Sequence, residues 1–143
     1  MRQSAGSLTL RILGERFGIA RMDPSAPWPA WLSQSGFSSI TRTSEELSIV
    51  CEESLVPPGV KLERGWGGIK IEGPLDFGLV GILSSIAGAL ADAGISLFAV
   101  STFDTDYVLV RQERMESAIE ALMRVGHRVV RPGSPPEIPR EGR

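Results

Sequence analysis

The chain has 143 residues, of which 42% are hydrophobic and 22% charged, as in an ordinary soluble globular protein. Its net charge of −2 provides no overall field that would attract nucleic acid or an anionic membrane. A single cysteine, Cys51, and a single histidine, His127, exclude an intrachain disulfide and a Cys/His zinc site. The polar opening residues do not resemble a secretory signal, so a cytoplasmic location is expected.

The first sixty residues look irregular, but part of them recurs later in the chain. The stretch T-R-T-S-E-E-L-S-I-V-C-E-E (41–53) aligns with S-T-F-D-T-D-Y-V-L-V-R-Q-E (101–113) at an offset of sixty residues. We interpret this as two copies of one unit. The helix of the first copy is shortened and has only P-W-P-A-W-L-S in its place. Chance similarity between short strand patterns is the alternative interpretation.

This interpretation divides the chain into an N-terminal unit, 1–62, and a C-terminal unit, 63–131. Residues 132–143 are rich in proline and polar residues and are expected to form a disordered tail. Trp66 and the Gly67-Gly68 pair lead from the linker into the second unit, so we expect them near the junction of the units.

The second unit has the clearest pattern of secondary structure. The expected elements are a strand over 66–72, a helix from Asp76 to about Asp92, a strand over 95–103, a turn at 104–105, a strand over 106–111, a helix over 115–125 and a strand over 127–131. The order βαββαβ predicts an α+β, ferredoxin-like fold: an antiparallel sheet with both helices on one face. The apolar stretch 77–103 is long enough to span a bilayer, but the Ala93-Gly94 break identifies it as a buried helix followed by a strand.

The strand after that helix is apolar on both faces: Ile95, Leu97 and Ala99 alternate with Phe98 and Val100. Helices cover one face, so the other needs the first unit or a second chain. A homodimer is therefore expected.

Two acids, Asp104 and Asp106, interrupt the apolar pattern in S-T-F-D-T-D-Y-V-L-V, and three explanations compete. The first is a metal site of the kind that glycosyltransferases form with a D-x-D motif. A bare D-x-D is a weak signal for it without the nucleotide-sugar domain that such enzymes need. In turn chemistry, Asp104 bonds its own backbone and Asp106 begins a strand. The alignment at sixty matches Asp106 to Glu46 but Asp104 to Ser44, so the turn explains Asp104 better than Asp106.

The third explanation is a ligand site. The loop of Asp76, Phe77, Gly78 and Leu79 opens a helix, whose free backbone N–H groups favour a carboxylate. Asp106, or Asp104 if the turn folds inward, would then meet an ammonium group. Whether this loop and the turn lie close together cannot be read from the topology alone.

The block G-P-L-D-F-G-L-V-G-I-L-S-S-I-A-G-A-L-A-D-A-G-I-S-L-F-A-V-S-T-F-D-T-D-Y-V-L-V resembles the ACT domain, in the branch shared with the CASTOR arginine sensors. Small bacterial proteins made of two tandem ACT units are similar over nearly the whole chain, and W-P-A-W and E-L-S-I-V carry the likeness in the first half. The resemblance implies amino-acid-binding regulatory modules that pair, with ligands at interfaces between ACT units. We expect no catalytic or DNA-binding domain within these 143 residues, which is a departure from the usual targets of ACT regulation.

We therefore expect a non-catalytic sensor that binds an amino acid or a similar small molecule, needs no cofactor or metal, and acts on an unidentified regulated protein. The alternative is a structural or protein-interaction module with a vestigial pocket. No catalytic residues are assigned: the serines have no histidine nearby in sequence, and Glu45 and Glu46 are adjacent, which sends them to opposite faces of a strand. RNA binding is disfavoured by few sheet aromatics and the acidic charge.

Overall fold

The computed structural model describes residues 7–72 and 81–133. Its elements in chain order are β1 (Thr9–Met22), η1 (Ala30–Gln34), β2 (Ser39–Arg42), β3 (Leu47–Glu52), η2 (Glu53–Leu55), β4 (Lys61–Ile71), α1 (Ile82–Asp92), β5 (Phe98–Ser101), β6 (Asp106–Arg111), η3 (Gln112–Arg114), α2 (Met115–Arg124) and β7 (Arg128–Val130).

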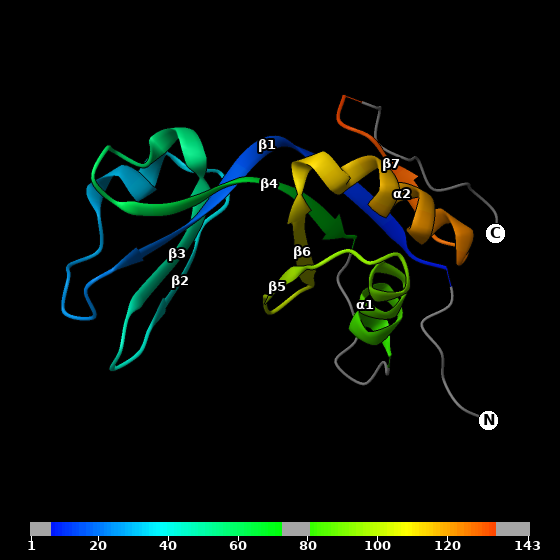
Figure 1. Ribbon diagram of the computed structural model, residues 1–143, viewed down its shortest axis with the longest axis horizontal. Helices are drawn as coiled ribbons and strands as arrows, with labels where there is room; N and C mark the ends of the chain where they lie inside the picture. The colour runs from blue at the N-terminus through cyan, green and yellow to red at the C-terminus, as the bar shows by residue number, and fades with distance from the viewer. Residues whose placement is uncertain (1–6, 73–80, 134–143) are drawn as a thin grey trace, which may run out of the picture.

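One sheet runs through the whole molecule in the order β2-β3-β1-β4-β6-β5, and β7 pairs with β1. The long strands β1 and β4 cross from one end to the other (Figure 1). The C-terminal end of β1 pairs with β3, whereas its N-terminal end pairs with β7 and with the C-terminal end of β4. Each half of the chain therefore supplies a strand to the sheet of the other half.

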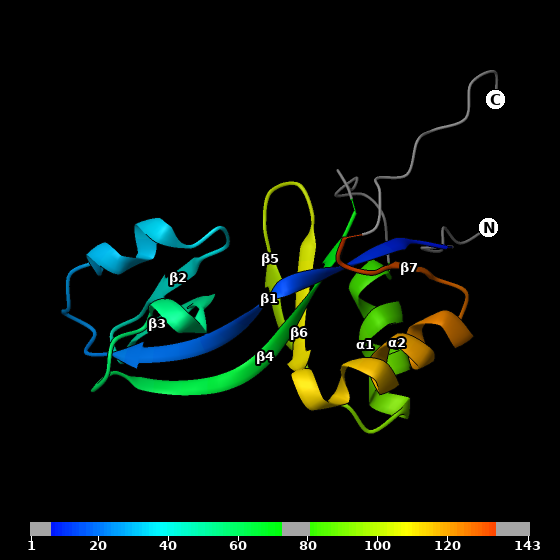
Figure 2. The same ribbon diagram turned by 90° about the horizontal axis from the view of Figure 1, so that it is seen from above.

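The second half has the predicted α+β, ferredoxin-like fold, and both helices lie side by side on one face of the sheet (Figure 2). β6 has the predicted bounds, whereas α1 begins at Ile82, later than the predicted start at Asp76. Gly81 precedes it with a φ of 84°, outside the helical region. Residues 73–80 and 134–143, which include the expected helix start and most of the expected tail, lie outside the described residues.

The expectation of a wholly antiparallel sheet is wrong at one position. β7 pairs with β1 in parallel, with Leu10 opposite Val129. β1 pairs with β7 in parallel and with β4 in an antiparallel orientation, so β1 is the strand next to β4 where β7 was expected. The cause is tertiary: β1 is long enough to extend out of the first half into the second.

A core between the helices and the sheet holds the second half together. Fully buried side chains of the sheet, such as Ile69 of β4 and Val108 of β6, pack there against both helices. Ile86 of α1 and Leu122 of α2 belong to the same core. We call the sheet face that carries this core the helix face, and the opposite one the open face. Burial of such side chains stabilises the fold by about 1.5–3 kcal/mol each.

A second cluster lies on the open face, where the two halves meet. This junction cluster consists of Phe17, Val50, Trp66 and Leu109, with Leu13, Ile19, Phe37 and Phe98 packed against it. The first half thus covers part of the open face, which is one of the two coverings expected. Trp66 is 8% exposed and lies 4.3 Å under the guanidinium of Arg111, so its predicted place at the junction is confirmed.

Gly68 also has a packing role at this junction. A Cβ atom there would come within 2.9 Å of side-chain atoms of Leu13 and Phe17, both from the first half. That distance is shorter than packed carbon atoms tolerate. The glycine therefore permits the close approach of the two halves.

The β2–β3 and β5–β6 hairpins have the same construction. β2 begins at Ser39 and β5 at Phe98, and β3 begins at Leu47 and β6 at Asp106. In both cases the starting residues are 59 positions apart, and the same holds for η2 and η3. The alignment of the sequence at sixty is therefore displaced by one residue, which makes Leu47, rather than Glu46, the structural counterpart of Asp106.

Candidate functional site

The turn between β5 and β6 is held by threonine, not by Asp104 as turn chemistry predicted. The Thr102 backbone N–H and hydroxyl both donate to the Thr105 carbonyl, at 2.8 and 3.0 Å, and the Thr105 N–H donates to the Thr102 hydroxyl at 3.3 Å. Asp104 is exposed, and within residues 7–72 and 81–133 its carboxylate makes no hydrogen bond. The turn therefore does not require an acid at position 104.

Asp106 is the first residue of β6 and is half-buried. Asp106 lies two and four residues before Val108 and Val110, whose side chains belong to the core under the helices. Residues at this spacing share one face of a strand, so Asp106 lies on the helix face. Its Cα partner across the hairpin is Ser101. A carboxylate in this position is partly shielded from water, which strengthens any charge-assisted hydrogen bond that it makes.

The end of β4 lies next to Asp106. Lys70 pairs with Tyr107, and the hydroxyl of buried Thr105 donates to the carbonyl of Ile71. The chain therefore leaves β4 at Glu72, towards the 73–80 segment, beside the start of β6. The predicted ligand-binding residues Asp76, Phe77, Gly78 and Leu79 lie in that segment, outside the described residues, and their role stays a prediction.

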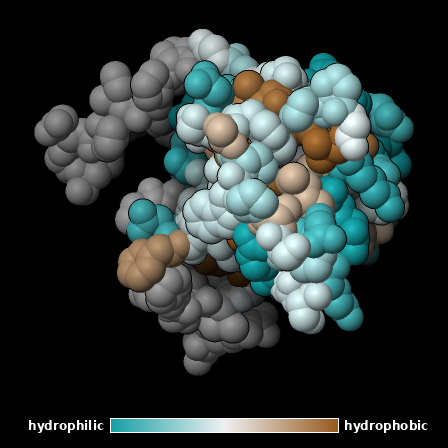
Figure 3. Space-filling model, turned by 90° about the vertical axis from the view of Figure 1, so that its left-hand side faces the viewer, coloured by the Kyte–Doolittle hydropathy of each residue, from teal (hydrophilic) through white to brown (hydrophobic). Residues whose placement is uncertain are grey.

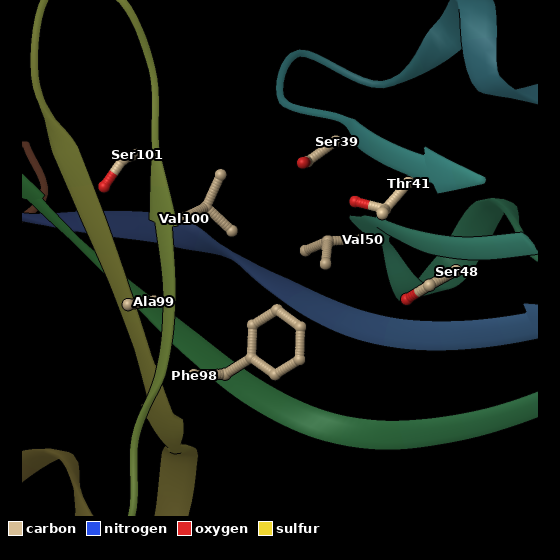
Figure 4. A pocket seen from close by; sticks show the side chains of 8 residues that line it. All are labelled: Ser39, Thr41, Ser48, Val50, Phe98, Ala99, Val100 and Ser101. Carbon is tan, nitrogen blue, oxygen red and sulfur yellow. The ribbon is translucent and has the colours of Figure 1, made fainter. Parts of the chain in front are cut away.

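A pocket of about 250 Å³ lies between the β2–β3 hairpin and β5 (Figure 4). Its lining consists of Ser39, Thr41, Ser48, Val50, Phe98, Ala99, Val100 and Ser101. In Figure 4 the hydroxyls of Ser39 and Thr41 point towards β5, while Val50 faces Val100. The two halves of the chain thus form a neutral, hydroxyl-rich pocket, and Ser101, the partner of Asp106, lies in its wall.

The pair of His127 and Ser85 cannot act as a nucleophile and base. The ring Nδ1 of His127 accepts the backbone N–H of Leu8 at 3.2 Å, which leaves the proton on Nε2, 3.3 Å from the Ser85 hydroxyl. Burial lowers the pKa of His127, which keeps the ring neutral. With Nε2 protonated, the imidazole donates to Ser85 and cannot remove its proton.

Cys51 does not have the environment of a reactive thiol. It is fully buried among Ala20, Leu47 and Ile49, and burial raises its pKa to about 11. A thiol with that pKa holds almost no thiolate at neutral pH. Within the described residues, no group of three or more His, Cys, Asp or Glu side chains could hold a metal ion.

Comparisons with known proteins identify the relatives of this chain. The ACT domain family matches residues 61–124, and a second family, described as an N-terminal domain, matches residues 15–59. The structure of the protein Atu0741 from Agrobacterium tumefaciens is 40% identical, covers 94% of this chain and 100% of that chain, and superposes with a TM-score of 0.85. The chain belongs to the same family as Atu0741, and residues 61–124 match the ACT domain family.

Two further proteins resemble this chain, one over part of its sequence and one in its fold. The human "Cytosolic arginine sensor for mTORC1 subunit 1" is 45% identical over 60 residues, which are 41% of this chain and 18% of that protein. The regulatory subunit of aspartate kinase from Thermus thermophilus is 13% identical with a TM-score of 0.61, over 86% of this chain and 99% of that chain, which shows the same fold. No helix in the described part of the chain is long and apolar enough to cross a membrane.

Proposed function

We propose that this protein is a non-catalytic regulatory module that binds an amino acid at an interface between two ACT units. The observation that carries the proposal is the position of Asp106. It lies half-buried at the start of β6, next to the strand end that leads into residues 76–79. The acid named from the sequence thus lies beside the end of β4, and the loop named with it follows β4 in the sequence.

The chemistry of recognition follows from the two groups. Backbone N–H groups of residues 76–79 would bind the carboxylate of the amino acid. Asp106 would bind its ammonium group or a basic side chain, with Asp104 in the exposed turn as the second acid. Neither contact transfers a proton or breaks a bond, so the site would sense its ligand without chemistry.

The tandem arrangement of two units, 1–62 and 63–131, is part of the proposal. The common separation of 59 residues between the two hairpins supports it. Since β1 and β4 each pair with strands of both units, a change at one unit would be transmitted along a continuous strand to the other. An unidentified regulated protein in the cytoplasm would receive the signal.

Calorimetry with a panel of amino acids tests the site, and arginine is the first candidate because a relative is named as an arginine sensor. Asp106→Ala should weaken binding by about 1–3 kcal/mol, the cost of a lost charge-assisted hydrogen bond. Asp92→Asn is the matched control, since this exposed acid lies at the other end of α1. Unchanged affinity of Asp106→Ala for every amino acid that binds the parent protein would contradict the proposal.

We also propose that the chain forms a homodimer. β2 and β5 lie at the two ends of the sheet order, and alternate residues of β5 remain exposed. Unpaired edges of this kind are templates for another strand. Light scattering should give twice the mass of the 15.4 kDa chain, and a monomer at all practical concentrations would contradict the dimer.

The competing function is an interaction module with a vestigial pocket, and exposed Trp28, at 68%, is the observation that favours it. Interaction surfaces are usually continuous apolar patches. Figure 3, which faces the end of the molecule formed by the first half, shows hydrophilic residues with only separated hydrophobic areas. Thermal stabilisation by an amino acid would favour the sensor, since a ligand that binds the native state must raise the unfolding midpoint.

A further inference from the structure

A second cavity, of about 320 Å³, lies on the open face of the sheet, opposite the face that carries Asp106. Its lining consists of Arg11, Leu13, Glu15, Gly36, Phe37, Glu52, Lys70 and Tyr107. Arg11 is paired with Lys70, and Lys70 with Tyr107, so these three residues form one row across β1, β4 and β6. The row forms one side of the cavity, and the remaining lining residues, all from the first half, form the rest.

The row side of the cavity is positively charged. The carboxylate of Glu72 lies between two cations: the Arg11 Nε is 2.6 Å from one oxygen, and the Lys70 Nζ is 3.4 Å from the other. The hydrogen bond from Arg11 lowers the pKa of Glu72, with Lys70 contributing, so this carboxylate is ionised at neutral pH. One carboxylate offsets one of the two cations, which leaves a positive charge at this wall.

The opposite side is negatively charged. Glu52 accepts the backbone N–H of Gly36 at 2.7 Å, which fixes its carboxylate at the cavity. Glu15 lies on β1 in the irregular stretch between Ile12 and Arg16. Within residues 7–72 and 81–133, neither glutamate forms an ion pair. The charges of the two walls are therefore opposite in sign, and the negative ones are not neutralised by this part of the chain.

Aromatic rings form the apolar part of the cavity. Phe37 packs on Tyr107 with ring centroids 4.6 Å apart, and on Phe17 at 5.7 Å. These contacts hold the segment of the first half over the sheet of the second. Phe37 thus offers an apolar surface beside the charged groups of the lining.

We propose that this cavity binds a small zwitterion, with its carboxylate at Arg11 and Lys70 and its ammonium group at Glu52 and Glu15. A dianion would be repelled by the glutamates, and a dication by the basic row. A molecule with both charges matches both walls, and its apolar part lies against Phe37 and Leu13. This site is separate from the proposed amino-acid site, since Tyr107 and Asp106 point to opposite faces of β6.

The test uses length-matched probes: 4-aminobutyrate, succinate and 1,4-diaminobutane, together with a panel of standard amino acids. Calorimetry gives the affinity, and NMR shifts of the Gly36 and Tyr107 amides report the site. A zwitterion should shift these amides and bind more tightly than succinate or the diamine. Lys70→Gln and Glu52→Gln should each weaken that binding by about tenfold or more, as expected for charge-assisted contacts.

The chain offers matched controls for both substitutions. Lys61, the other lysine, is exposed on the same strand, and Glu113 is exposed in η3. Lys61→Gln and Glu113→Gln should leave the affinity unchanged, and the side-chain amide oxygen that Glu52→Gln introduces can still accept the N–H of Gly36. The proposal is overturned if no probe shifts the Gly36 or Tyr107 amide, if both test variants bind like the parent, or if succinate binds as tightly as the zwitterion. Asp106→Ala, which tests the other site, should not change the shift that the zwitterion causes at the Gly36 amide.

Discussion

The β2–β3 and β5–β6 hairpins differ at a position that their shared backbone makes equivalent. β3 begins with Leu47, which is fully buried with Ile49 and Cys51. β6 begins with Asp106, which is half-buried and followed on the same face by Val108 and Val110. Because a leucine satisfies this position in one hairpin, the fold does not require a carboxylate in the other. The comparison therefore favours a ligand role for Asp106 over a structural one.

The largest expected effect comes from moving the acid to the first hairpin. Leu47→Asp places a carboxylate among buried apolar side chains where no cation lies in the cluster. An uncompensated buried charge costs about 3–5 kcal/mol, so the free energy of unfolding in urea should fall by that amount. A loss below about 1 kcal/mol, the usual effect of a surface substitution, would mean that position 47 tolerates a carboxylate as position 106 does, and would contradict the difference between the two hairpins.

The reciprocal change should have a much smaller effect on stability. Asp106→Leu adds apolar area beside Val108 at a half-buried position, so its free energy of unfolding should stay within about 1 kcal/mol of the parent. Amino-acid binding at the proposed site should nevertheless be lost. Urea unfolding and calorimetry on the same sample separate the two effects. A large loss of stability in Asp106→Leu would indicate that Asp106 has a structural role.

Local patterns allowed much of the second half to be predicted from the sequence. Alternation fixed the bounds of β6, and apolar spacing predicted α2, which ends before Gly126 with its φ of 101°. The parallel pairing of β7 with β1 was missed because it joins residues almost a whole chain apart. No window of the sequence contains that information.

The candidate sites show the same limit. Asp106 stands out in sequence because an acid interrupts an apolar strand, but Thr102, which holds the turn, gives no such signal. The open-face cavity was not predicted, because it combines Arg11 and Glu52 from the first half with Lys70 and Tyr107 from the second. The exchange of β1 and β4 between the halves brings these residues together.

The turns of the β2–β3 and β5–β6 hairpins test the same comparison, with a smaller expected effect on stability. Thr43 holds the first turn in a similar way to Thr102 in the second: its N–H donates to the Glu46 carbonyl at 2.9 Å, and its hydroxyl accepts the N–H groups of Glu45 and Glu46 at 3.0 and 3.1 Å. Thr43→Val and Thr102→Val should each cost about 1 kcal/mol, the net contribution of a hydrogen bond. Thermal unfolding of both variants measures this. Costs that differ by more than about twofold would contradict the equivalence of the turns.

The smallest expected effect is a pH dependence confined to the second half, where His127 has no histidine counterpart in the first. Burial lowers its pKa in the folded protein below the ordinary 6.5, so the unfolded chain binds the proton more readily. Its contribution to stability is therefore complete above about pH 6.5 and decreases as the pH falls through that value.

His127→Gln removes the titration, and its amide can still face the Leu8 N–H and the Ser85 hydroxyl. Urea unfolding of both proteins between pH 7 and pH 5 should show a steeper loss of stability in the parent, by less than about 1.4 kcal/mol per pH unit, the limit for one proton. Other groups titrate in both proteins and cancel in the difference, Glu72 among them. Parallel curves would show that His127 titrates alike in the folded and unfolded chain, and that its burial between α1 and β1 does not disfavour the charged ring.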